Sequence, residues 1–560
     1  MAALPKKAHW PPAYIYLQSA AIALAVWWFT RGFYQDDSYI TLVYARNWLE
    51  GYGLVWSRGD EPVEGYSNFL YMVLIAALGW LGMDLVLASR AVSFVGYFGL
   101  VAVLYGFTQT MYRRKFASSE KFYAHQINAA LCVGLVASAV PVLAWVMGGL
   151  ETVLFSFLLT GAVCFVLYWL EFGLSKKMVF LTGVLFALAT MTRMEGLMIW
   201  GMTGIVLGLF WLLPSQRKHL DFSRLMLLFL GFMLLVAPWM AWKYSFYGDF
   251  LPNTYYAKVY GIPEGILSFL GWLYIFQAFY IPPLLWLACL ILFLLTFHQL
   301  RASRSVILLI TLAALLVWHI ITSGGDHMPY LRFYAPVVPL LCLILYYCAS
   351  VLVEKNELRF RDFSGAMIVF SVFQLGIIED LVVSRGAVSG TSVAAHIEAH
   401  WKKGALIAIN PAGALPYYAP DFRYVDMLAL NDKHTARLDL SEDERLKNWP
   451  RLTIGHLKTD GVYVLSRKPD YIMFGEAWGD EKPRFMSDFT IAEQRDFQTN
   501  YRRVETYIDI APERLEQLRE MDRMNQEDFK ANPDNPRWVR GPVVSNDNKL
   551  RFIYYERIKS

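Results

Sequence analysis

The sequence predicts a polytopic α-helical membrane protein that carries a soluble C-terminal domain. Of its 560 residues, 56% are hydrophobic and only 18% are charged, and the mean hydropathy is +0.35. Such a composition over a long chain is typical of proteins that cross a lipid bilayer several times. From residue 380 onward, charged residues become frequent and apolar runs short. We therefore expect a membrane domain at 1–379 and a soluble domain of about 180 residues at 380–560.

Apolar runs predict about eleven membrane crossings. The first run, at about 14–30, follows Lys6 and Lys7 and has no small-residue cleavage site behind it, so we expect an uncleaved helix with a cytoplasmic N-terminus. The further runs lie at about 91–111, 128–147, 152–170, 178–193, 196–213, 225–243, 283–299, 305–322, 334–352 and 364–379.

Basic loops predict the orientation of the chain, because Lys and Arg near helix ends stay on the cytoplasmic side. Two shorter runs, 69–82 and 265–281, would break this pattern if they crossed. We expect them to be interfacial or re-entrant helices on the outer side, although the alternative that they cross stays open. The protein is thus predicted to be a multi-pass protein of the cytoplasmic (inner) membrane with an extracytoplasmic C-terminal domain. The basic loops lie at 113–115, 176–177, 217–224, 301–304 and 355–361.

Composition also excludes several classes of function. A net charge of +4 is too small to indicate a nucleic-acid partner, and there is no Walker, Rossmann or zinc-finger spacing. The five cysteines all lie in apolar runs, where a thiol behaves as a small hydrophobe, so neither a disulfide framework nor a metal cluster is indicated.

Asp36 and Asp37 directly follow the first apolar run. Two carboxylates at a membrane face are costly, and in a pocket that excludes water such a group is a good general base for an alcohol. The alternative is that one of them caps an amphipathic helix over residues 38–50 that lies on the membrane. Adjacent acids also leave room for Mg²⁺ or Ca²⁺, although no metal site is certain.

Cationic side chains are predicted to gather on the same outer side. Arg193 and Glu195 interrupt an apolar run, and Lys258, His327 and Arg332 lie in outer loops. Phosphate oxygens prefer such donors, which favours a lipid-phosphate substrate. Two other interpretations are an ion pair between Arg193 and Glu195 without a catalytic role, and an Arg332 that anchors a helix end.

The soluble domain is predicted to be α/β or α+β. Short apolar runs at 405–409, 462–465 and 471–474, and a final one at 550–558, are typical of buried strands, whereas 512–524 has the pattern of an amphipathic helix.

An ordered set of motifs resembles the GT-C glycosyltransferases, and more narrowly the family of the mycobacterial terminal β-1,2-arabinofuranosyltransferase. The first outer loop carries Gln35-Asp36-Asp37-Ser38-Tyr39-Ile40, Tyr44-Ala45-Arg46-Asn47, Gly51-Tyr52-Gly53-Leu54-Val55 and Val63-Glu64-Gly65-Tyr66-Ser67-Asn68. Further matches follow in the same order at 148–152, 192–196, 247–254 and 324–329. The sequence departs from the family at Met194, where Pro is frequent, and at His327, where Trp is frequent.

The resemblance implies a GT-C fold of about eleven transmembrane helices plus interfacial helices. It implies transfer of a sugar, D-arabinofuranose in the nearest family, from a polyprenyl phosphate to a glycan, protein or lipid acceptor of the cell envelope. Asp36 is the expected base, and Asp37 would orient it, bind the acceptor or hold a metal. No cofactor is required. The donor phosphate would contact Arg193, Lys258, Arg332 and His327, and the substrates would contact Tyr39, Arg46, Glu64, Tyr66, Asn68, Glu195, Asn253 and Asp326.

Two other functions stay open at this level. A flippase for lipid-linked sugars would spread polar residues across the bilayer midplane. A membrane-anchored envelope assembly protein would act through its soluble domain instead.

Overall fold

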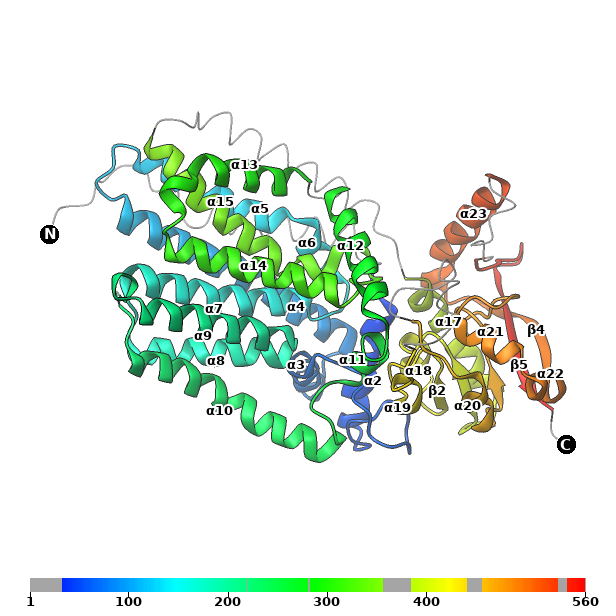
Figure 1. Cartoon of the computed structure of the whole chain (residues 1–560). Coiled ribbons are helices and arrows are strands. Elements are labelled where there is room, and N and C mark those ends of the chain that lie inside the picture. The colour runs from blue at the N-terminus through cyan, green and yellow to red at the C-terminus, as the bar shows by residue number, and fades with distance from the viewer. Residues whose placement is uncertain are drawn as a thin grey trace.

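The computed structural model describes residues 33–217, 219–280, 283–355, 384–440, 456–531 and 541–558. A bundle of long helices is followed by a smaller domain with a β-sheet, which lies against one end of the bundle (Figure 1). The predicted boundary at 379/380 falls outside the described residues.

The bundle contains helices long and apolar enough to cross a membrane. Among the described residues six helices meet this criterion, and a seventh span results if α5 and α6, bent by 49°, count as one. The predicted spans at 14–30 and 364–379 lie outside the described residues. The bundle comprises α4 (Leu85–Lys115), α5 (Phe122–Ser138), α6 (Val140–Met147), α7 (Thr152–Phe172), α8 (Lys176–Thr192), α9 (Glu195–Leu212), α10 (Phe222–Tyr247), α13 (Pro283–Leu300), α14 (Arg304–Thr322) and α15 (Val337–Glu354).

Small residues allow the closest helix contact in the bundle, between α8 and α10. A Cβ atom on Gly183 would lie 2.2 Å from the carbonyl oxygen of Leu228, and one on Gly231 would lie 2.1 Å from that of Phe180. Neither position therefore accepts a larger residue without separating the backbones. Such small-residue contacts are how helices associate in lipid, where no hydrophobic effect drives them together.

Short helices and loops gather at the end of the bundle that meets the soluble domain. They are α2 (Asp36–Leu49), α3 (Phe69–Trp80), α11 (Asn253–Lys258), α12 (Glu264–Tyr280) and the 3₁₀ helix η2 (Pro329–Tyr334). With 12 residues, α3 is only about 18 Å long, too short for a hydrocarbon core of about 30 Å. In Figure 1, α12 runs across the ends of the long helices.

The described residues of the basic loops lie together at the opposite end of the bundle (Figure 1). Lys115 forms an ion pair of 2.6 Å with Glu171, whose other oxygen accepts a 2.6 Å hydrogen bond from Ser305. His125 contacts Glu354 at 2.6 Å. The two ends of the bundle thus differ in chemistry as the charge pattern predicted.

The soluble domain is built on a mixed five-stranded sheet with strand order β2-β1-β3-β5-β4. β1 pairs parallel with β2 and β3, and β5 pairs antiparallel with β3 and β4. Its elements are α17 (Arg385–His400), β1 (Leu406–Ile409), α18 (Ala414–Tyr418), β2 (Arg423–Asp426), α19 (Lys433–Ala436), α20 (Gly461–Ser466), β3 (Tyr471–Ile472), α21 (Met486–Ala492), α22 (Arg495–Asn500), β4 (Tyr501–Asp509), the 3₁₀ helix η4 (Pro512–Arg514), α23 (Leu515–Ala531) and β5 (Lys549–Arg557).

Most predicted elements of this domain are confirmed, but the strand expected at 462–465 is wrong. That segment is helix α20, which begins where the Asp460 carboxylate accepts a 2.9 Å hydrogen bond from the backbone N–H of Tyr463. Four apolar residues are too few for periodicity to separate a strand from a buried helical turn, and the capping acid decides the outcome here.

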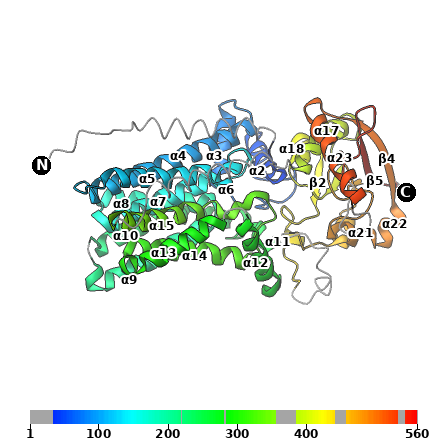
Figure 2. The same cartoon turned by 90° about the horizontal axis from the view of Figure 1, so that it is seen from above.

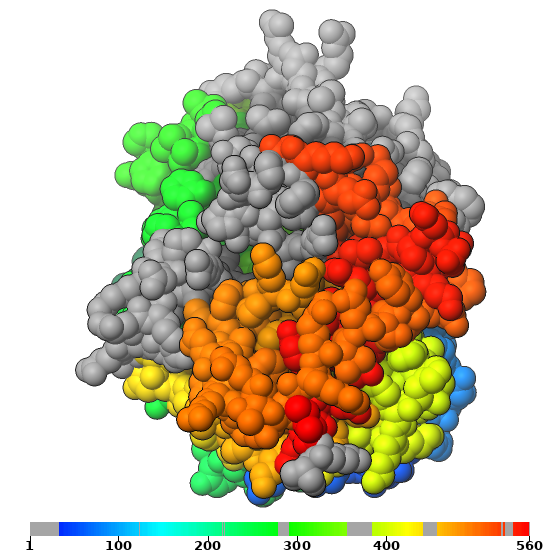
Figure 3. All heavy atoms as spheres, turned by 90° about the vertical axis from the view of Figure 1, so that its right-hand side faces the viewer, coloured from blue at the N-terminus to red at the C-terminus, as the bar shows by residue number. Residues whose placement is uncertain are grey.

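The carboxyl ends of the parallel strands face the helix bundle. The segments that follow β1 and β2 contact α2, so α18 and α2 lie side by side in Figures 1 and 2. Viewed from the side of the soluble domain, residues of that domain fill the lower and right part of the view, and parts of the bundle show at its margins (Figure 3). Ligands of open parallel sheets bind at this edge.

Candidate active site

Asp36 joins the membrane domain to the soluble domain. Its two carboxylate oxygens accept hydrogen bonds from the backbone N–H groups of Gly413, at 3.0 Å, and Ala414, at 2.9 Å. A Cβ atom on Gly413 would lie 1.8 Å from the backbone oxygen of Asp36. Only glycine therefore permits this approach, and the Asp36 carboxylate is held in place from the soluble side.

The alternative prediction, that Asp36 or Asp37 is the N-cap of this helix, is wrong. The N-cap of α2 is Gln35, and it makes no side-chain capping bond, while Asp36 and Asp37 occupy the first helical turn. The amphipathic character predicted for this segment is also wrong. Ten of the 14 residues of α2 are buried, because the soluble domain covers the side that was expected to face water.

Asp37 has different surroundings. Between residues 33 and 45 it is the one residue whose side chain is not buried. It makes no hydrogen bond or ion pair within the described parts of the chain. Its carboxylate lies close enough to His327 to raise the pKa of that ring, although burial and the positive charge of Lys258 lower this pKa by more.

Basic side chains from both domains surround His327. Its ring lies 4.8 Å from that of His456, which belongs to the soluble domain. His456 is buried, and its Nδ1 atom has no hydrogen-bond partner among the described residues. Burial, His327 and Lys258 together lower the pKa of His456 well below its usual range. The ammonium group of Lys258 also makes no ion pair within the described segments.

Asp326 orients the fourth basic side chain of this group, Arg332. Its carboxylate accepts a 2.7 Å bond from Nε of Arg332 and lies 3.6 Å from Nδ1 of His327. Both Nη groups of Arg332 are without a hydrogen-bond partner in the described part of the chain. The neighbouring Tyr330 and Leu331 have φ angles of 59° and 53°, a left-handed conformation that is strained for such residues and is often found at functional sites.

Arg193 lies in a separate buried ion-pair network. Its guanidinium contacts Glu151 at 2.8 Å and Glu195 at 2.5 Å. Asn68 donates a 2.9 Å bond to Glu151, and His319 lies 3.5 Å from Glu195. Two carboxylates therefore neutralise Arg193 before any substrate binds. The guanidinium groups of Arg193 and Arg332 lie 4.8 Å and 5.3 Å from the centre of the Phe333 ring, and the three side chains line one small cavity.

Three of the predicted substrate residues connect the domains. The hydroxyl of Tyr39 lies 3.3 Å from that of Tyr418, and Arg46 donates to the carbonyl oxygens of Pro416 and Tyr417. Asn253 donates to the carbonyl oxygens at 429, 430 and 432 at 2.9 to 3.2 Å. These side chains hold the soluble domain on the bundle.

Two further predicted residues fix the first outer loop to α10. Glu64 is buried and forms a 2.8 Å ion pair with Lys243, and the hydroxyl of Tyr66 lies 3.1 Å from that of Tyr247. Lys243 and His319 were not singled out from the sequence, although charged or titratable residues inside apolar runs are a usable signal. His456 belongs to a polar segment, 455–458, where the sequence left ligand binding open, but only the fold shows that it lies beside His327.

A metal is not indicated by the arrangement of ligands. Among the described residues, no group of three or more His, Cys, Asp or Glu side chains could hold a metal ion. Backbone N–H groups already occupy both oxygens of Asp36, so an ion at the acid pair would depend on Asp37 alone. The sequence predicts that no cofactor is required and leaves a divalent cation as an option.

We expect the stability of the protein to depend on the protonation of Asp36. Burial raises the pKa of this carboxyl to about 7, against the lowering effect of the Ala414 N–H group. Because the folded pKa exceeds the unfolded one, the contribution of Asp36 to stability is present at low pH and is lost as the pH rises through about 7. The melting temperature should therefore fall between about pH 4 and pH 7 more steeply than that of Asp36→Asn, which cannot titrate, and level off above pH 7. Parallel pH profiles would contradict this.

Known structures of similar fold cover almost the whole chain. ArnT from Cupriavidus metallidurans, in a crystal structure bound to undecaprenyl phosphate, is 12% identical with a TM-score of 0.54, over 97% of this chain and 98% of that one. The archaeal oligosaccharyltransferase AglB from Archaeoglobus fulgidus, in complex with an inhibitory peptide and a dolichol-phosphate, is 10% identical with a TM-score of 0.52, over 98% and 89%. The GT-C fold predicted from the sequence motifs is confirmed.

Sequence comparisons add less. A family model described as a domain of unknown function (DUF8728) matches residues 382–529, within the soluble domain. No curated protein matches the chain significantly.

Proposed function

We propose that this protein transfers a sugar from a polyprenyl-phosphate carrier to a cell-envelope acceptor at the outer face of the cytoplasmic membrane. One observation carries the proposal: an accessible carboxylate, Asp37, lies beside a group of basic side chains at the end of an apolar helix bundle. The lipid phosphates in the ArnT and AglB structures support a donor of this class.

The proposed reaction is a single inverting displacement. Asp37 takes the proton of the acceptor hydroxyl, and the hydroxyl oxygen forms a bond to the anomeric carbon. The bond from that carbon to the phosphate oxygen breaks, and the lipid phosphate leaves with the electron pair. Positively charged donors stabilise the charge that develops on the phosphate. We assign this role to Lys258 and Arg332, whereas His327 and His456, whose pKa values are lowered, would donate hydrogen bonds to the phosphate as neutral rings.

Asp37 is a better candidate for the base than Asp36. A general base must reach the proton it removes, and Asp37 has no competing partner among the described residues. Both Asp36 oxygens are occupied by the Gly413 and Ala414 N–H groups. We assign Asp36 to positioning the helix turn that carries Asp37. Because two carboxylates neutralise Arg193, we assign it to positioning as well.

The sugar is proposed to be D-arabinofuranose, on the strength of the ordered motifs of the first outer loop. Purified protein should be incubated with polyprenyl-phosphate-linked arabinofuranose, mannose and glucose, each with a panel of envelope-type acceptors. We expect transfer with arabinofuranose and inversion at the anomeric carbon.

The Asp37→Asn variant serves as the inactive control for the donor panel. Transfer of mannose or glucose instead of arabinofuranose would overturn the sugar assignment alone. Lack of transfer from every donor would overturn the glycosyltransferase proposal.

A further inference from the structure

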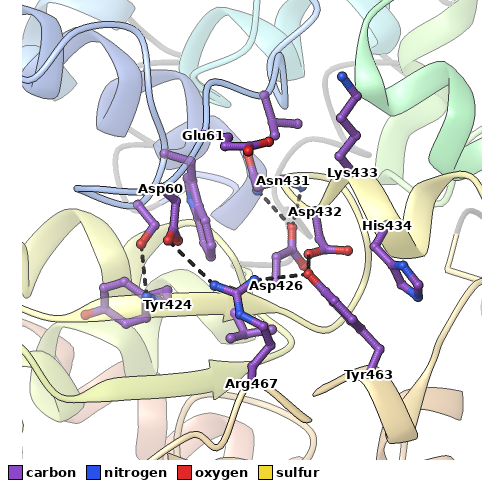
Figure 4. Close-up of a pocket in the computed structure, with 14 residues that line it drawn as sticks. Asp60, Glu61, Tyr424, Asp426, Asn431, Asp432, Lys433, His434, Tyr463 and Arg467 are labelled. Atoms are coloured by element: carbon purple, nitrogen blue, oxygen red, sulfur yellow. Dashed lines mark hydrogen bonds and ion pairs between the residues drawn. The ribbon is translucent and has the colours of Figure 1, made fainter. Parts of the chain in front are cut away.

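A second cavity, of about 380 Å³, lies between the first outer loop and the soluble domain. Its volume is within the range of small-molecule sites, whereas the cavity beside Lys258 and His327 measures about 40 Å³. Trp56 and Glu61 come from the outer loop, and Asp426 from the carboxyl end of β2. Figure 4 shows Asp60 and Glu61 on one side of the cavity and Asp432, Tyr463 and Arg467 on the other.

The charges that line this cavity argue against an anionic ligand. Four carboxylates, those of Asp60, Glu61, Asp426 and Asp432, line the cavity with two permanent cations, Lys433 and Arg467. Arg423 also pairs with Asp60, at 3.0 Å, so the carboxylates exceed the permanent cations by one. Burial raises the pKa of Asp426 to about 6, so this acid too is ionised at neutral pH. The net negative charge of the lining would repel a phosphate. No group of described side chains has the arrangement of a metal site.

Hydrogen bonds hold the wall of the cavity in place. The hydroxyl of Tyr463 donates to Asp432 at 2.9 Å and accepts from Arg467 at 3.0 Å. Arg467 also lies 3.6 Å from Asp60, which is part of the outer loop. Donors and acceptors therefore alternate across the cavity in fixed positions, an arrangement that suits a ligand whose every polar group both donates and accepts. Hydroxyl groups have this property.

Two side chains at the rim of the cavity, Glu61 and Lys433, can form further hydrogen bonds. Glu61 is exposed and makes no ion pair within the described residues. The side chain of Lys433 is 44% exposed, and its ammonium group lies 3.6 Å from the carboxylate of Asp249 and donates a long, 3.4 Å hydrogen bond to the carbonyl oxygen of Tyr247. A ligand in the cavity can thus reach one free acceptor and one loosely held donor.

The cavity is connected to the helix that carries Asp37. Asn431, in its lining, accepts a 3.1 Å bond from the hydroxyl of Tyr44 in α2. Tyr44 follows Asp37 by two helical turns, roughly 10 Å along the axis. Tyr44 is fully buried, so the cavity and the reacting carboxylate hold fixed positions relative to one another through α2.

We propose that this cavity binds a neutral oligosaccharide and that the acceptor of the reaction is a glycan. The identification of the acceptor as a glycan rests on the proposed function. The binding of an oligosaccharide does not, because it requires neither the donor nor catalysis.

The test is binding of neutral arabino-, manno- and gluco-tetrasaccharides to the purified full-length protein without donor, with inorganic phosphate as the anionic probe. We expect at least one tetrasaccharide to bind and phosphate not to compete with it. Glu61→Ala and Lys433→Ala should each weaken that binding about tenfold, the effect of one hydrogen bond to a charged group. Lys402→Ala, an exposed lysine of the soluble domain outside the cavity, should leave it unchanged.

The two variants distinguish the classes of ligand. An anion would bind more tightly to Glu61→Ala, and a cation more tightly to Lys433→Ala, whereas a neutral sugar loses affinity in both. Opposite responses, or no binding of any tetrasaccharide, would overturn the inference. If a tetrasaccharide binds but no donor supports transfer to it, the proposed function fails while the saccharide site stands.

Discussion

Replacing Asp37 with Asn should reduce sugar transfer by about 10²- to 10⁴-fold, the usual contribution of a general base. The amide of Asn has nearly the same shape but cannot take a proton from the acceptor hydroxyl. Because Asp37 makes no hydrogen bond within the described residues, the melting temperature should stay within experimental error of the wild type. Transfer rates and thermal unfolding of the purified protein measure both effects.

The Asp36→Asn variant is the matched control for Asp37→Asn. An Asn side chain has one acceptor oxygen where Asp36 has two, and its NH₂ group would face one of the N–H groups of Gly413 and Ala414. A buried donor without a partner costs about 1–3 kcal/mol, so this variant should unfold at a lower temperature. If Asp36→Asn kept full stability and lost all transfer, while Asp37→Asn stayed active, the assignment of the base would be reversed.

Replacing Arg193 with Met should destabilise the protein by about 3–5 kcal/mol, because it leaves Glu151 and Glu195 buried without their cation. The expected result is a large fall in the melting temperature. Arg224→Met is the control, because its partner Asp221 is 40% exposed and a surface ion pair contributes only about 0–1 kcal/mol.

A rescue experiment identifies the cause of the destabilisation. Adding Glu151→Gln and Glu195→Gln to Arg193→Met removes both unpaired charges and should recover much of the lost stability. An Arg193→Met protein as stable as the wild type, yet inactive, would instead indicate direct contact between Arg193 and the substrate.

The fold could be predicted largely from local patterns. Long apolar runs predicted the helix bundle. The alternation of basic and polar loops predicted that its two ends differ in chemistry, and short apolar runs predicted most strands of the sheet. The strand predicted at 462–465 is wrong because four apolar residues do not distinguish a strand from a helix. This segment is helical because Asp460 caps it. The acid pair was found because carboxylates beside a membrane are rare for physical reasons.

The division of labour within the site could not be predicted, because it depends on contacts far apart in the sequence. Asp36 and Asp37 are neighbours, and only the approach of Gly413 and Ala414 distinguishes them. His456 gains its surroundings from His327 across the domain boundary. Tyr39, Arg46 and Asn253 were recognised as unusual polar residues, but sequence alone did not indicate that they hold the soluble domain.

The hydrogen bonds between Asp36 and the loop after β1 have a consequence for protein engineering. The reactive turn of α2 takes its shape from residues nearly four hundred positions later in the chain, so the membrane and soluble portions are not exchangeable modules. A chimaera that combines the bundle of one relative with the soluble domain of another should lose this fit. A chimaera that takes the first outer loop and the soluble domain from the same relative should keep the fit between them.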